Sequence, residues 1–204
     1  MHTRSELILG GQRSGKSRRA ELLARDWLAQ SPGHKAVMIA TATAWDDEMV
    51  ARIARHQQDR AERVPGMLTV EEPVDLGEAI QTHSSPQTLV VVDCLTLWLT
   101  NLLMPHENAE NSAENAQNSL ENVPNMAIGQ QIRAQQATLL IAIKNAPGPV
   151  VLVGNEIGLG VVPMGRETRE FVDALGRLNQ DVAATCERVT FMAAGLALTL
   201  KGAL

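Results

Sequence analysis

Apolar residues fall along the chain in short runs that are separated by longer amphipathic stretches. Four runs are continuously apolar, "ELILGG", "KAVMIATAT", "TLVVVDCLT" and "GPVVLVGNE", at residues 6–11, 35–43, 88–96 and 148–156. Runs of this kind are typical of strands covered on both faces. Stretches of helical periodicity lie between and after them, at residues 16–30, 46–63, 74–82, about 126–145 and 166–186. Strands that alternate with helices predict an α/β fold with a doubly wound, mostly parallel sheet.

The two remaining segments depart from this alternation. The chain end "RVTFMAAGLALTLKG", residues 188–202, predicts one more buried strand, a turn at Gly195 and a final antiparallel strand. Residues 105–125, "PHENAENSAENAQNSLENVPN", carry little apolar surface and predict a flexible, solvated Asn-rich insertion. No other segment divides the chain, so residues 1–204 are expected to form a single domain.

Composition narrows the function classes. A net charge of −5 argues against a general nucleic-acid or membrane-surface binder, because both need a basic field. Cys94 and Cys186 lack metal-ligand or disulfide-framework spacing and are expected to be buried core residues. No segment has the apolar length of a signal peptide or a spanning helix, which predicts a cytoplasmic protein.

The stretch "LILGGQRSGKSRRAE", residues 7–21, matches the pattern G-x-x-x-x-G-K-[ST] between a predicted strand and a predicted helix. In this context, backbone N–H groups and the helix N-terminus cradle phosphates, Lys16 reaches the β- and γ-oxygens, and the Ser17 hydroxyl binds Mg²⁺. The expected phosphate-binding residues are Gly10, Gly11, Gln12, Arg13, Ser14, Gly15, Lys16 and Ser17. A plain glycine turn is the alternative.

A second acidic ligand for the same magnesium ion is expected at the end of another strand, and "TLVVVDCLT" supplies Asp93 there. An Asp that caps the following helix is the alternative. With the glycine loop, Asp93 predicts a P-loop NTPase fold of the RecA-like kind. A regulatory GTPase is not supported, because N-K-x-D is absent and D-x-x-G occurs only at Asp173–Gly176, inside a predicted helix.

One histidine lies in informative surroundings. In "DDEMVARIARHQQDR", residues 46–60, four-residue spacing places Glu48, Arg52, His56 and Arg60 on one helix face. Flanking cations would keep the imidazole neutral, the form that attacks phosphorus, and would neutralise a triphosphate. The spacing alone favours the other interpretation, a solvated polar helix face with an incidental histidine, and does not settle the choice between the two.

Several motifs in this order resemble one family. They are "GGQRSGKS", "ATATAWDDEMVARIARH", "TVEEPVDL", "VVDCLTLWLTNLL", "VGNEIGLGVVPMGRETREFVDALGRLNQ" and "AAGLALTLKG". Together they resemble the bifunctional adenosylcobinamide kinase and adenosylcobinamide-phosphate guanylyltransferase of cobalamin synthesis. The resemblance covers nearly the whole chain apart from the Asn-rich segment.

The resemblance implies two reactions. The γ-phosphoryl group of ATP or GTP is transferred to the aminopropanol hydroxyl of adenosylcobinamide. GTP then guanylylates a histidine, with release of pyrophosphate, and the substrate phosphate attacks this intermediate to give adenosylcobinamide-GDP. The family's histidine falls on His56, which favours the catalytic interpretation of that residue. A covalent intermediate divides one displacement between anions into two steps.

Further site residues follow from the resemblance. It implies that the nucleotide contacts Thr41, Ala42, Thr43, Gln57, Gln58, Asp59, Arg60, Glu71 and Asp93, with Mg²⁺ at Ser17 and Asp93. The segment before "TVEEP" is a few residues longer than in the family, so Glu72 is an alternative to Glu71. The resemblance also implies a homotrimer with nucleotide sites near the subunit contacts.

Two other functions are compatible with a P-loop. One is a kinase of another small alcohol without a covalent histidine, which would take no label from the α-phosphate of GTP. The other is a nucleotide-gated binding or assembly module without turnover, which would release no pyrophosphate.

Overall fold

A seven-stranded sheet organises the molecule, with strand order β3-β2-β4-β5-β1-β6-β7. The computed structural model describes residues 3–43, 47–104 and 123–202, without the side chains of residues 47–49, 52, 56 and 123–128. Every neighbouring pair of strands is parallel except β6 and β7. The strands are β1 Ser5–Gly10, β2 Lys35–Ala40, β3 Leu68–Glu71, β4 Thr88–Asp93, β5 Val150–Val153, β6 Arg188–Ala193 and β7 Leu196–Lys201.

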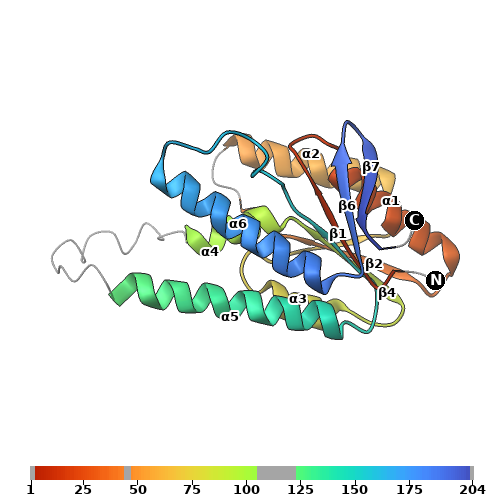
Figure 1. Ribbon diagram of the computed structural model, residues 1–204. Helices are drawn as coiled ribbons and strands as arrows, with labels where there is room; N and C mark the ends of the chain where they lie inside the picture. Colours follow the sequence, from red (N-terminus) through yellow and green to blue (C-terminus); the bar gives the residue numbers. More distant parts are fainter. Residues whose placement is uncertain (1–2, 44–46, 105–122, 203–204) are drawn as a thin grey trace.

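Helices cover both faces of this sheet (Figure 1). Their bounds are α1 Lys16–Gln30, α2 Asp47–Arg63, α3 Leu76–His83, α4 Leu95–Leu103, α5 Val123–Asn145 and α6 Arg166–Thr185. Because side chains alternate along a strand, Leu7 and Leu9 of β1 join the core under α3, α4, α5 and α6, whereas Ile8 joins the core under α1. We refer to these as the α6 face and the α1 face of the sheet.

The structure confirms the doubly wound, mostly parallel sheet and its antiparallel C-terminal strand. The buried state predicted for Cys94 and Cys186 is also confirmed. An Asn-rich insertion was predicted at residues 105–125. Residues 105–122 of it lie outside the described part of the chain, and residues 123–125 form the start of α5. Among the helices that the structure describes, none combines the length and apolar character needed to cross a bilayer.

Several details of the predicted elements are wrong. The strands predicted at 35–43, 88–96 and 148–156 end at Ala40, Asp93 and Val153. Helix α4 was not predicted; it begins at Leu95, just after β4, and no glycine or proline separates the two elements in the sequence. The short edge strand β3 was not predicted, because its four residues include the exposed Leu68 and none of them is fully buried.

Candidate active site

The glycine loop between β1 and α1 has the backbone that its glycines allow. Gly10 has φ 152° and Gly15 has φ 99°, in a region that side chains with a Cβ rarely adopt. A Cβ on Gly10 would also overlap the carbonyl oxygen of Met192 and lie 2.7 Å from Ser14 Oγ. The loop therefore passes so close to β6 that it requires glycine at position 10. Gly11, Gln12 and Arg13 form its exposed crest.

Lys16 begins α1 and turns back over this loop. Its Nζ donates a hydrogen bond to the Gly11 carbonyl at 2.6 Å, and the residue is only 8% exposed. Burial lowers the pKa of Lys16 from its usual value, and the neighbouring Cys94 and Asp93 act in the opposite direction. An ammonium held in this way is a fixed donor that a phosphate oxygen could share, at a helix N-terminus that favours anions.

Two segments distant in the sequence support the loop. The Gly195 N–H, in the turn between β6 and β7, donates to the Ser14 carbonyl at 3.0 Å. On the other side of the loop, the Glu156 N–H, after β5, donates to the Gly10 carbonyl at 3.1 Å. The loop is thus held at both ends before any ligand binds.

Asp93 ends β4, and β5 lies between that strand and β1. Thr41 fixes the backbone there: its N–H donates to the Asp93 carbonyl at 3.1 Å. Its Oγ1 donates to the Cys94 carbonyl at 2.7 Å and accepts from the Cys94 N–H at 2.9 Å. Thr41 is fully buried, and its hydroxyl holds the segment after β2 against the end of β4. Ala42 and Thr43, the next two residues, are half-buried.

Asn101 of α4 is a site residue that the sequence reasoning missed. Its Nδ2 donates to the carbonyls of Thr41 at 2.8 Å and Pro73 at 3.1 Å. Its Oδ1 accepts from Thr43 Oγ1 at 3.4 Å. One buried amide therefore ties the segment after β2 to the segment after β3. In the sequence, the only indication of this role is that Asn101 is the single amide side chain in the mostly apolar segment "LTLWLTNLL".

The two candidate glutamates at the end of β3 have different partners. Glu71 is exposed and accepts a hydrogen bond from Gln57 Nε2 of α2 at 3.3 Å. The Oε1 atom of Glu72 accepts from the N–H groups of Val74 at 2.9 Å and Asp75 at 2.8 Å, just before α3. The Glu72 carboxylate is thus hydrogen-bonded to the backbone that follows it, whereas Glu71 is exposed and is the more accessible of the two to a ligand.

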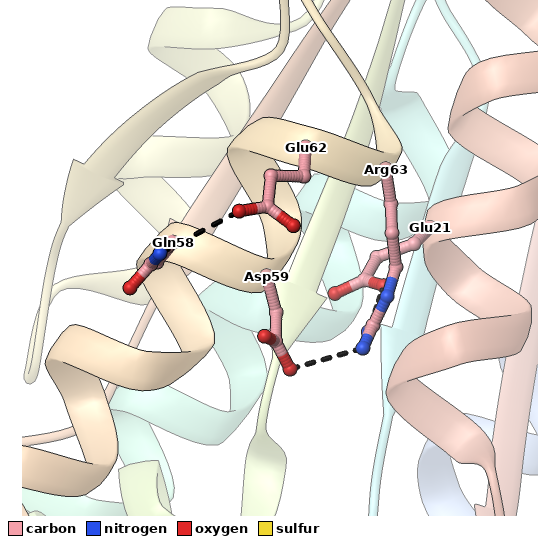
Figure 2. Close-up of polar contacts among 5 residues, drawn as sticks. All are labelled: Glu21, Gln58, Asp59, Glu62 and Arg63. Atoms are coloured by element: carbon pink, nitrogen blue, oxygen red, sulfur yellow. Dashed lines mark hydrogen bonds and ion pairs between the residues drawn. The ribbon is translucent and has the colours of Figure 1, made fainter.

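The C-terminal half of α2 is attached to α1 and β3. Arg63 donates to Glu21 of α1 at 3.0 Å and to Asp59 at 2.9 Å (Figure 2). Glu21 is buried, so this contact holds the end of α2 against α1. Gln58 donates to Glu62 at 3.5 Å within α2.

Arg60, on the face predicted to carry the histidine, is buried and not solvated. Its Nη1 donates to Thr69 Oγ1 of β3 at 3.0 Å, and its Nε has no hydrogen-bond partner among the described residues. At Arg60, the described end of this face, the helix is therefore packed against β3 and not solvated. The backbone of His56 lies in α2, on the same face as Arg60 by helical spacing, and its side chain lies outside the described part.

Ser17 and Asp93 fit a magnesium ion by their chemistry. A hydroxyl and a carboxylate are hard oxygen ligands, and Mg²⁺ is bound by one or two such groups with phosphate oxygens and waters completing its shell. Within the described residues, no group of three or more His, Cys, Asp or Glu side chains forms a metal cluster. A dedicated protein cage is not needed for this ion.

The parallel sheet, the loop around Lys16 and the acidic residue at the end of β4 define a P-loop nucleotide-binding protein. Residues 6–200 match the family described as cobinamide kinase / cobinamide phosphate guanyltransferase, and the chain belongs to that family. The predicted identity, a bifunctional kinase and nucleotidyltransferase of cobalamin biosynthesis, is thereby confirmed at the level of the family.

Curated relatives agree with this assignment. The chain is 42% identical over 97% of its length to the bifunctional adenosylcobalamin biosynthesis protein CobP of Pseudomonas aeruginosa, covering 97% of that protein. It is 37% identical over 96% of its length to CobU of Escherichia coli, covering 98% of it. A solved structure of the flagellar accessory protein FlaH from Methanocaldococcus jannaschii aligns over 98% of this chain and 79% of that one. At 11% identity and a TM-score of 0.49, that likeness supports no functional conclusion.

Proposed function

We propose that the protein phosphorylates the aminopropanol hydroxyl of adenosylcobinamide with ATP or GTP. It then transfers GMP from GTP to the resulting phosphate through a guanylyl-histidine at His56. The observation that carries the nucleotide chemistry is the buried Lys16 ammonium, fixed on the Gly11 carbonyl at the N-terminus of α1. Membership of the family supplies the class of substrate.

In the first reaction, the loop Gly10–Ser17 binds the triphosphate through its backbone N–H groups, and Lys16 neutralises charge on the transferred phosphoryl group. Ser17 and Asp93 would hold a magnesium ion, which would neutralise further charge on the phosphates. The Thr41–Asp93 and Thr41–Cys94 hydrogen bonds support this role, because they hold Asp93 in register with the segment that leads to α2.

In the second reaction, an imidazole nitrogen of His56 attacks the α-phosphorus of GTP. A P–N bond forms as the bond to the pyrophosphate leaving group breaks. An oxygen of the substrate phosphate then attacks the same phosphorus, the P–N bond breaks, and His56 is regenerated. Thr43, Gln57, Arg60 and Glu71 are the contacts proposed for the nucleotide in this step. Their location after β2, on α2 and at the end of β3 supports a shared binding region.

Labelling with GTP tests the covalent step. Incubation with α-labelled GTP in the absence of a corrinoid is expected to give an acid-labile, base-stable adduct on the wild-type protein and none on His56→Ala. A matched control is His83→Ala, which changes a histidine at the end of α3. Persistent labelling of His56→Ala at the wild-type level contradicts the assignment of the nucleophile.

The two activities are expected to respond differently to substitution. His56→Ala should lose guanylyl transfer and keep phosphorylation of adenosylcobinamide, whereas Lys16→Ala should impair both, because both reactions use the phosphate cradle. A folded His56→Ala protein that has lost both activities would contradict this division. The proposed assembly is a homotrimer, which sedimentation of the full chain measures.

A further inference from the structure

The chain stays extended beyond the end of β5, alongside the start of the glycine loop. The Gly154 N–H donates to the Ile8 carbonyl of β1 at 3.0 Å. Two residues later, the Glu156 N–H donates to the Gly10 carbonyl at 3.1 Å. Donors two residues apart that meet acceptors two residues apart follow the pattern of a parallel ladder, so the chain remains paired with β1 as far as Glu156.

The side chain of Asn155 lies on the α1 face of this extension. A Cβ on Gly154 would lie 3.2 Å from Leu9 Cδ2 and 3.3 Å from Asn179 Oδ1, both on the α6 face. Glu156 lines a surface depression on that same face, together with Leu9. Successive side chains of an extended chain point to opposite faces. Asn155, between these two residues, therefore points to the α1 face, where the glycine loop leads into α1.

The register of the sheet places Asn155 between the glycine loop and Asp93. Val153 pairs with Ile8 of β1 on one side and with Asp93 of β4 on the other. Two residues further on, Asn155 is level with Gly10 and lies just beyond Asp93. Neighbouring strands are about 4.8 Å apart, so the amide is close to the ends of both flanking strands.

Two charged side chains flank this place on the same face. Val91 of β4 belongs to the core under α1, so Asp93, two residues later, also projects from the α1 face. Burial lowers the pKa of Lys16, and the nearby Cys94 and Asp93 act in the opposite direction. The Lys16 ammonium and the Asp93 carboxylate therefore lie near each other, in front of the strand end that carries Asn155.

The fold uses the backbone of Asn155 and leaves its side chain available. The Asn155 N–H donates to Thr96 Oγ1 of α4 at 2.9 Å, and its carbonyl accepts from Asn179 Nδ2 at 3.1 Å. Its side-chain amide is half-buried and makes no hydrogen bond with any residue in the described part of the chain. Because an amide offers two N–H donors, this side chain can still bind a ligand's oxygen atoms.

We propose that Asn155 donates a hydrogen bond from Nδ2 to the terminal phosphoryl group of the bound nucleoside triphosphate. Lys16, on one side of it, is the proposed partner of the β- and γ-phosphates, and Asp93 lies on the other side. A neutral, fixed donor between them adds to the stabilisation of the phosphoryl oxygens. A diphosphate lacks this group, so the contact distinguishes the triphosphate substrate from the diphosphate product. This inference rests on the proposed function, because it takes the glycine loop as the triphosphate site.

Calorimetric titration with a matched pair of guanine nucleotides tests this contact, with magnesium chloride present and no corrinoid. The α,β-methylene analogues of GTP and GDP differ only in the terminal phosphoryl group, and neither can transfer GMP to His56. Asn155→Ala removes the amide, and Asn155→Leu replaces it with an apolar side chain of similar size. The matched control is Gln180→Ala, which removes an exposed amide of α6 on the other face of the sheet.

Both Asn155 variants are expected to raise the Kd of the GTP analogue by about tenfold, the contribution of one hydrogen bond to a charged group. The Kd of the GDP analogue should stay at the wild-type value, and Gln180→Ala should change neither. Both variants should unfold at the wild-type urea concentration, because the hydrogen bonds that position 155 makes within the fold come from its backbone.

Three results overturn the inference. The first is an unchanged Kd of the GTP analogue in both variants. The second is an equal rise for both analogues, because the amide would then act on the nucleotide or the loop as a whole and not on the terminal phosphoryl group. The third is a rise of the same size in Gln180→Ala.

The outcomes separate this inference from the proposed function. Wild-type protein that takes the GTP label at His56, while the Asn155 variants keep full affinity for the GTP analogue, refutes the role of Asn155 alone. Wild-type protein that takes no label, with a selective loss of the GTP analogue in the Asn155 variants, refutes the covalent step alone.

Discussion

Replacement of Asn101 by alanine tests whether one buried amide holds the nucleotide-binding segments together. The change removes two donated hydrogen bonds, to the carbonyls of Thr41 at 2.8 Å and Pro73 at 3.1 Å. Each bond contributes about 1 kcal/mol net, and a buried carbonyl left without its donor costs about 1–3 kcal/mol. Because a water molecule could enter the space vacated by the side chain, the expected loss of stability is about 2–4 kcal/mol in total.

Urea unfolding, followed by circular dichroism, measures this loss as a shift of the midpoint at constant slope. For a chain of this size the melting temperature should fall by about 5–15 °C. The KM for GTP should rise as well, because the segments that carry Thr43 and Glu71 lose their shared anchor.

Two further variants at this helix sharpen the test. Asn101→Asp should be more damaging than alanine, since a carboxylate only accepts hydrogen bonds and would face two carbonyl oxygens. Thr100→Ala is the control, because its hydroxyl donates to Thr96 within α4 and its loss should cost less than about 1 kcal/mol. The amide does not act as the donor described if Asn101→Ala unfolds at the same urea concentration as Thr100→Ala. The same conclusion follows if Asn101→Asp is as stable as the wild-type protein.

Two other predictions address packing and thiol chemistry. Gly77→Ala should destabilise the protein by about 1–2 kcal/mol in urea unfolding, because its Cβ would lie 2.8 Å from Thr138 Cγ2 and 2.9 Å from the Thr138 carbonyl carbon. Gly176→Ala, with open space at its Cβ, should instead stabilise by up to about 1 kcal/mol, and equal effects of both variants would contradict the packing argument. Burial raises the pKa of Cys94 to about 11 and that of Cys186 to about 12, so both stay protonated at neutral pH. Native protein should therefore react with a thiol reagent only slowly, with both thiols titrating once denaturant is added; rapid reaction of the native protein would contradict their burial.

Local patterns were sufficient to predict the phosphate loop. Gly10, Gly15 and Lys16 lie within one strand–loop–helix unit, so their spacing alone predicted the fold of that segment. The parallel sheet followed from runs such as "TLVVVD", which are apolar because both faces of the strand are covered.

Features that depend on contacts between distant segments were not predictable in the same way. Asn101 looks unremarkable in its helix, and its importance comes from carbonyls 60 and 28 residues earlier in the chain. Arg60 has the spacing of a solvated face, yet it is buried because β3 packs beside it. The separate roles of Glu71 and Glu72 likewise depend on the position of α2 and on the start of α3.

The most direct test of the central claim is to locate the covalent intermediate. Wild-type protein is mixed with GTP and no corrinoid, digested, and analysed by tandem mass spectrometry, with pyrophosphate release measured in parallel. The account predicts a GMP adduct on the peptide that contains His56, a stoichiometric burst of pyrophosphate, and transfer of the GMP when adenosylcobinamide phosphate is added. A GMP adduct on another residue, or steady formation of adenosylcobinamide-GDP by His56→Ala, would contradict it.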